Sequence, residues 1–201
     1  MKLLLMLGIM ALTGFAVIQP DPISAEDDLT YVDQLPIQSE TSLKKFRFKG
    51  YTIKPLADFT IEAKVLNYMK YDSDKESELS PIDLALGWGP MSRERVISEI
   101  NISQKGRWYF WQTDNFPVPR KDIEFNSANM HMIPATDDVK TRLMRVRKGD
   151  IVRFNGILVE CIQKNWRWKS SLTREDTGNG ACEVIYVTDF TVIPVEQLAI
   201  K

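Results

Sequence analysis

The sequence has very little of the two side chains that most often carry enzyme chemistry. It contains one histidine, His131, and two cysteines, Cys161 and Cys182, among 201 residues. The zinc patterns H-E-x-x-H and C-x-x-C are absent, and so is the G-x-S-x-G turn of many serine hydrolases. The sequence therefore predicts no metal and no cofactor.

An excess of charge of one sign is also missing. The chain has 26 Lys and Arg against 27 Asp and Glu, which gives a formal net charge of −1. No overall field attracts nucleic acid or an anionic membrane, so neither is expected as a partner of the folded part. Selective binding has to come from a local site.

A long hydrophobic run occurs only once, at the amino terminus. Lys2 precedes an uncharged apolar run, Leu3–Ile18, and Pro20 and Pro22 follow before the sequence ISA ahead of Glu26. This order is typical of a secretory signal peptide, residues 1–25, and predicts a periplasmic or secreted protein. The alternative is a retained membrane anchor, although the run is shorter than the roughly 20 residues that span a bilayer.

The rest of the chain divides into two parts. Residues 26–45 are polar and without periodicity, which predicts a flexible spacer. Residues 46–201 have ordinary globular composition and a length that suits a single domain. We see no internal repeat.

Hydrophobic patterns predict more strands than helices in this domain. The alternation over 59–68 and the apolar or aromatic runs over 106–112, 151–162, 166–172 and 181–193 indicate strands, with a bulge or bend at Gly156. Helices are expected from Ser80 over 80–88, from Ser92 over 92–100, and after the N-cap Thr136. The expected fold class is α+β, mainly antiparallel β, in a small partly closed barrel of the OB type with two or three short inserted helices. A flat sheet with packed helices is the alternative.

Three stretches carry a resemblance. They are LSPIDLALGWGPMS (79–92), NSANMHMIPA (126–135) and SSLTREDTGNGACE (170–183). They resemble a family of uncharacterised exported bacterial proteins, over about residues 46–193. The resemblance implies that the three stretches belong to one domain, and it implies no activity.

The lone histidine is the first candidate for chemistry. An imidazole suits proton transfer near neutral pH, and Ser171 or Cys182 would be its nucleophile. Asn129 shares the face of His131 if this segment is extended. The alternative is that His131 is a hydrogen-bonded structural group.

Two other groups of residues are candidates for ligand binding. Arg174 and Asp176 lie in a glycine-rich stretch that suits an anion, or that forms a hairpin loop with its own ion pairs. Alternation places Trp166 and Trp168 on one face of a strand, where they stack on a glycan or peptide or else fill the core. Cys161 and Cys182 form a disulfide if their strands meet, and otherwise stay free thiols.

Three classes of function remain open from the sequence. The favoured class is a non-catalytic cell-envelope domain that binds a partner protein or an extracellular ligand, either glycan or peptide. The second is an exported hydrolase that uses His131 with Ser171 or Cys182, and Arg174 as an anion site. The third is a structural or assembly factor of the envelope.

Overall fold

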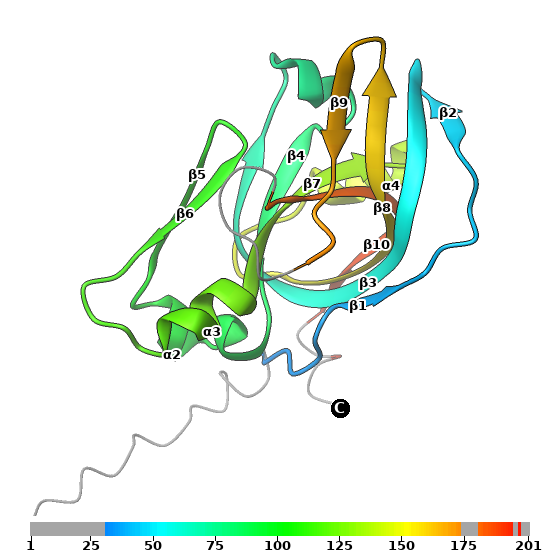
Figure 1. The fold of residues 1–201 in the computed structure, drawn as a ribbon. Coiled ribbons are helices and arrows are strands. Elements are labelled where there is room, and N and C mark those ends of the chain that lie inside the picture. Colours follow the sequence, from blue (N-terminus) through cyan, green and yellow to red (C-terminus); the bar gives the residue numbers. More distant parts are fainter. Residues whose placement is uncertain (1–30, 174–180, 195–196, 198–201) are drawn as a thin grey trace, which may run out of the picture.

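A computed structural model describes residues 31–173, 181–194 and 197 of the chain (Figure 1). Within these residues the protein is mostly β, with three short α-helices, in agreement with the expected α+β class. The predicted signal peptide, Arg174 and Asp176 lie outside the described residues. No helix within the described ranges combines the length and the apolar character that crossing a membrane requires.

Five strands pair in a ring that organises the whole molecule. Each strand pairs with the next, and the last pairs with the first. In order round the ring they are β3 (Tyr51–Lys70), β4 (Ile82–Gly87), β7 (Ser127–Pro134), β10 (Glu183–Ile193) and β8 (Ile151–Gln163). All the pairings are antiparallel except that of β7 with β10, which is parallel.

The length of β3 allows the ring to close. Its residues 52–64 pair with β8, and its residues 64–70 pair with β4. The register shifts once on each side, around Leu56 and Leu66, and such bulges bend a strand and increase its twist. The single strand therefore curves around one side of the molecule, as Figure 1 shows.

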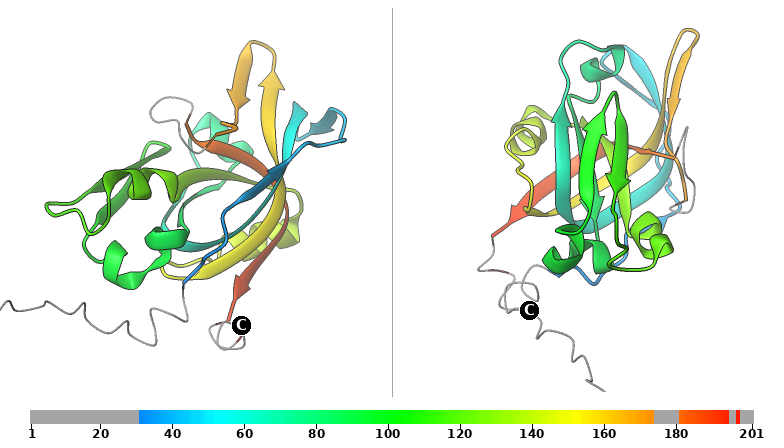
Figure 2. Two further views of the ribbon diagram at one scale, coloured as in Figure 1. Left: turned by 60° about the horizontal axis from the view of Figure 1, so that its bottom comes forward. Right: turned by 90° about the vertical axis from the view of Figure 1, so that its left-hand side faces the viewer.

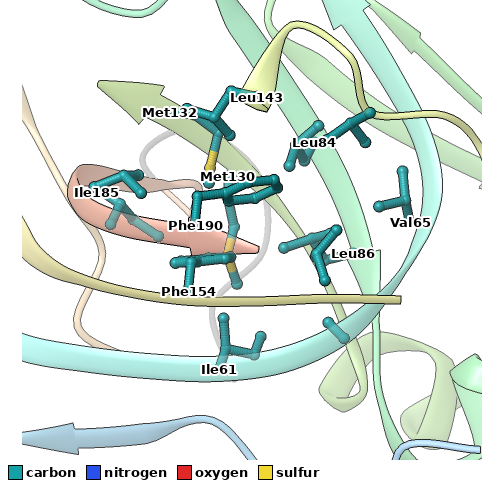
Figure 3. Packing of buried hydrophobic residues seen from close by; sticks show 14 of the residues in the cluster. Ile61, Val65, Leu84, Leu86, Met130, Met132, Leu143, Phe154, Ile185 and Phe190 are labelled. Carbon is teal, nitrogen blue, oxygen red and sulfur yellow. The ribbon is translucent and has the colours of Figure 1, made fainter. Parts of the chain in front are cut away.

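The main hydrophobic core fills the inside of this ring. Figure 3 shows side chains from all five strands meeting there, among them Phe154, Phe190, Met130 and Met132. The helix α4 (Asp137–Leu143), between β7 and β8, adds Leu143 to the same cluster. This packing fixes the positions of the ring strands, including the polar side chains that they carry.

Between β4 and β7 the chain leaves the ring and forms a separate small layer. It contains η2 (Gly89–Ser92), α2 (Glu94–Ile97), the hairpin of β5 (Asn101–Lys105) with β6 (Trp108–Gln112), and α3 (Arg120–Phe125). Figures 1 and 2 show this hairpin standing beside the ring, with α2 and α3 at one end. Leu66, Met91 and Ile123 belong to the core between the two parts.

Shorter elements complete the fold. The strand β9 (Trp166–Lys169) pairs with β8, while β1 (Ile37–Ser39) and β2 (Phe46–Phe48) pair with β3. One 3₁₀ turn, η1 (Lys75–Glu78), lies between β3 and β4.

Part of the segment expected as a spacer belongs to the folded domain. Val32 is buried, and its N–H donates to the Ser92 hydroxyl at 2.9 Å while its carbonyl accepts from Gly89 at 2.7 Å. The strand β1 follows within the same segment. The chain therefore joins the domain well before Phe46, the expected boundary.

The helix expected over 80–88 is wrong. Residues 82–87 of this range form β4, which is buried along its whole length between β3 and β7. A strand that is covered on both faces needs no polar–apolar alternation, so Ser80 and Pro81 appeared in the sequence as a helix start. The helix expected over 92–100 is reduced to α2, whereas α4 has the predicted cap, with Thr136 Oγ1 accepting from the Val139 N–H.

Gly156 lies at the irregularity predicted for it, although the extra residue is on the partner strand. The register between β10 and β8 shifts between Val187 and Asp189, opposite Gly156 and Asn155. A Cβ on Gly156 would lie 2.7 Å from the Tyr186 carbonyl oxygen. Glycine is required here because the two backbones approach so closely.

Candidate functional site

An aspartate and the lone histidine face each other on neighbouring ring strands. Asp83 of β4 is the cross-strand partner of His131 of β7, so their side chains project from the same face of the sheet. His131 Nδ1 lies 2.9 Å from Asp83 Oδ2, and both side chains are buried. The contact is an ion pair, and neither atom forms a hydrogen bond of regular geometry within the described residues. Asp83 therefore fixes the orientation of the imidazole.

Cys182, from the C-terminal part of the chain, lines the same pocket as His131. It immediately precedes β10, whose first residue, Glu183, is the parallel partner of Met130 in β7. Cys182 is among the groups that raise the pKa of His131, and the Asn129 amide nitrogen lies 3.7 Å from Sγ of Cys182. Because Nδ1 faces Asp83, the other ring nitrogen, Nε2, is the one available to the thiol. The order is thus thiol, imidazole, carboxylate.

The surroundings of His131 favour its charged form. Burial lowers the pKa of His131, but the hydrogen bonds and charges of Asp83 and Cys182 outweigh burial and raise the pKa from 6.5 to about 9. At neutral pH the imidazole is therefore protonated, next to a thiol. An imidazolium stabilises an adjacent thiolate, which is the nucleophilic form of cysteine.

Asn129 is held in place by two other groups. Its Oδ1 accepts from Gln104 Nε2 at 2.6 Å, and its Nδ2 donates to the Arg107 carbonyl oxygen at 3.1 Å. Gln104 belongs to β5, and Arg107 lies in the turn between β5 and β6. The inserted hairpin therefore orients an amide N–H donor beside the sulfur.

His131 and Cys182 line an open pocket of about 470 Å³, while Asp83 and Asn129 are buried behind them. The pocket joins residues of the ring, the inserted hairpin, η1 and β9, and the partly exposed Cys182 is one of them. Its lining consists of Glu76, Gly106, Arg107, Trp108, His131, Arg167, Trp168, Lys169 and Cys182.

The tryptophans of β9 take the arrangement that the alternation predicted. Trp166 and Trp168 are half-buried on one face, and Arg167 points the other way to an ion pair with Glu160. The Trp168 ring lies 4.7 Å from the His131 imidazole, centroid to centroid. Trp168 therefore forms one wall of the pocket, whereas Trp166 packs on Tyr51.

Ser171, Cys161 and Cys182 have different surroundings in the structure, which distinguishes them as candidate nucleophiles. The Ser171 hydroxyl donates to the Thr173 carbonyl, and the Ser171 N–H bonds the Cys182 carbonyl, so Ser171 supports the chain beside the pocket. Cys161 is a free thiol, fully buried in a separate apolar cluster, and burial raises its pKa to about 12. Cys182 is a free, partly exposed thiol.

Asp83 and Arg107 were not among the candidate residues expected from the sequence. Asp83 is the one charged residue in the apolar run 81–91 and was assigned to a helix that does not exist. Arg107 is distinguished only by its place after Gly106 in a hairpin turn.

No group of three or more metal-ligating side chains occurs within the described residues. Comparison of the chain with protein-family models, with curated proteins and with solved structures finds no match in any of the three.

Proposed function

We propose that the protein is a thiol-dependent hydrolase or acyltransferase in which Cys182 is the nucleophile. The observation that carries the proposal is that Cys182 and His131 line one open pocket while the buried Asp83 carboxylate pairs with the His131 imidazole. A nucleophile, a base within hydrogen-bonding reach and a third group that orients the base are the parts that covalent acyl transfer needs.

The reaction that fits these groups is attack on an ester, thioester or amide carbonyl. The Cys182 thiolate adds to the carbonyl carbon, while the Asn129 amide stays beside the sulfur and keeps it in place. The His131 imidazolium gives its proton to the leaving group as the acyl–sulfur bond forms. His131 then takes a proton from water, which attacks the thioester, so that the acid is released and the thiolate and the imidazolium are restored.

The ring order supports the finer classification as an OB-like barrel. OB-folds are five-stranded Greek-key barrels that bind ligands on their second and third strands and the neighbouring loops. In this chain the second and third ring strands are β4 and β7, which carry Asp83, Asn129 and His131. The proposed active site then occupies the face that this class of fold uses for ligands.

Two measurements on the full chain test the proposal. At pH 6, iodoacetamide should alkylate Cys182 at least about tenfold faster than the same thiol in urea-unfolded protein, because a neighbouring imidazolium promotes nucleophilic attack by a thiol. With p-nitrophenyl acetate, mass spectrometry should find an acetyl group on Cys182 that is lost on further incubation. Replacing His131 with Gln should remove both effects.

Cys161 and Ser171 provide the controls. Cys161 should resist alkylation in the folded protein, and S171A should keep the fast reaction of Cys182. Alkylation of Cys182 at the rate of the unfolded thiol, with no acetyl group captured, would overturn the proposal.

A second candidate is the non-catalytic binding domain that the sequence favoured. Trp108 and Trp168 line the pocket from two different elements, and such paired aromatic walls suit a sugar ring or a peptide side chain. If Cys182 has ordinary reactivity while an oligosaccharide or a peptide still changes tryptophan fluorescence, and W168A abolishes that change, binding without chemistry is the function.

A further inference from the structure

Arg107 is a charged residue in direct contact with Asp83, and it has no part in the proposed mechanism. It lies in the turn between β5 and β6, with φ of +71°, a conformation that is uncommon for a residue with a side chain. Its side chain is largely buried and reaches back toward the ring. An uncommon backbone conformation that positions a largely buried guanidinium against Asp83 indicates a specific role for Arg107.

The Arg107 guanidinium and the His131 imidazole contact different oxygens of the Asp83 carboxylate. Arg107 Nη1 donates to Asp83 Oδ1 at 2.7 Å, while Asp83 Oδ2 lies 2.9 Å from His131 Nδ1. One oxygen therefore faces a permanent cation, and the other faces the imidazole. The negative charge that acts on His131 is smaller than that of an unpaired carboxylate.

Asp74 and Tyr71 hold the Arg107 side chain in the position from which it contacts Asp83. Its Nε and Nη2 donate to the two oxygens of Asp74, at 2.8 and 2.7 Å, and its guanidinium carbon lies 3.6 Å from the Tyr71 ring centroid. Its backbone N–H donates to the Tyr71 hydroxyl at 3.1 Å. The same residue also holds Asn129 through its carbonyl oxygen.

We propose that Arg107 is the positioning residue of this site. It orients the Asp83 carboxylate so that one oxygen faces His131, and its positive charge limits how strongly that carboxylate raises the proton affinity of the imidazole. Such moderation matters because His131 has to release its proton in each turnover, and an unshared buried carboxylate would retain it. The inference rests on the proposed function for its consequence in catalysis, although the charge effect can be measured without a substrate.

Several ionisable groups surround His131, and the test has to separate Arg107 from them. They are Asp83 from β4, Cys182 and Glu183 at the start of β10, Tyr71 and Asp74 ahead of η1, Glu76 of η1, and Arg167 and Lys169 of β9. A single substitution at Arg107 leaves all of them in place.

The lone histidine makes the experiment direct. In a full chain without a histidine tag, the ring signals of His131 are the only histidine signals in an NMR titration. R107Q should raise the proton affinity of His131 about tenfold, since a cation next to its carboxylate partner is lost. R107K should restore a value close to that of the wild type. R153Q, which removes the exposed partner of Glu62 elsewhere on the ring, is the matched control and should change nothing.

The outcomes are distinct. A merely structural role for Arg107 predicts that R107Q loosens the site and moves the pKa of His131 down, toward that of a solvated imidazole. A lower or unchanged pKa would therefore overturn the inference. Slow alkylation of Cys182 would overturn the proposed function instead, and the NMR result would still stand by itself.

Discussion

At the scale of single residues, the site depends on polar groups that are buried and paired. Asp83 is fully buried, yet its two oxygens meet Arg107 and His131, so its charge is balanced within the domain. Removing one member of such a set leaves the others as uncompensated buried charges, which is strongly destabilising. Conservative substitutions such as H131Q and R107K are for this reason better probes than alanine.

The raised pKa of His131 makes stability depend on pH. Its pKa is about 9 in the folded protein, against about 6.5 in an unfolded chain. The stabilisation is fully present below pH 6.5 and is lost as pH rises through 9, so the free energy of unfolding should fall over this interval. The loss should be on the order of 3 kcal/mol.

Urea unfolding at pH 6 and at pH 9.5 measures this change. The buried Cys161 thiol contributes a loss in the same direction, so the comparison has to be made with H131Q, which retains Cys161. Equal pH dependence in the two proteins would contradict the assignment of the effect to His131.

At the scale of elements, Gly156 is a position where the paired strands β8 and β10 leave no room for a side chain. A Cβ there would lie 2.7 Å from the Tyr186 carbonyl oxygen and 2.8 Å from Ile185 Cγ2. G156A should therefore cost about 2 kcal/mol of unfolding free energy through overpacking. Thermal or urea unfolding gives the value, and N155A, which alters the exposed neighbour in the same strand, should cost clearly less.

The segment ahead of β1 should be needed for stability. Val32 is buried against the ring, whereas Leu35, three residues later, is two-thirds exposed. V32A should lower the free energy of unfolding by about 2 kcal/mol, since it removes buried methyl groups. L35A should have almost no effect, and similar losses for the two variants would mean that this segment is not docked in solution.

The sequence predicts some elements of this fold well and others badly, for physical reasons. The alternation in β9 and the cap at Thr136 are local properties, so both agree with the structure. The strand β4 is covered on both faces, and a continuous apolar run of that length is compatible with a helix or a strand. The error had a consequence at the site, because Asp83 could not be placed opposite His131 without β4.

Long-range contacts explain what else was missing. Cys182 and Ser171 were equal candidates in the sequence, and only the parallel pairing of β10 with β7 distinguishes them. Parallel register cannot be derived from one strand alone. In contrast, the shared face of Asn129 and His131 followed from their spacing of two residues and agrees with β7.

At the scale of the whole molecule, the sequence predicts export. The apolar run Leu3–Ile18 and the ISA stretch before Glu26 motivate a cleaved signal peptide. Amino-terminal sequencing of the native protein should give a first residue near Glu26, in a fraction outside the cytoplasm. Recovery of Met1 from a membrane fraction would support the alternative, a retained anchor.

The closure of the ring has a consequence for the order in which the protein is made. β3 pairs with β8 through residues about a hundred positions apart in the chain, such as Thr52 with Ile162. Synthesis therefore has to pass β8 before β3 meets this partner, and such distant pairings form slowly. Cys182, the proposed nucleophile, is made later still, after Asp83 and His131. A growing chain thus carries the His131–Asp83 pair before Cys182, and the site that we propose is complete only when the last strand, β10, has docked.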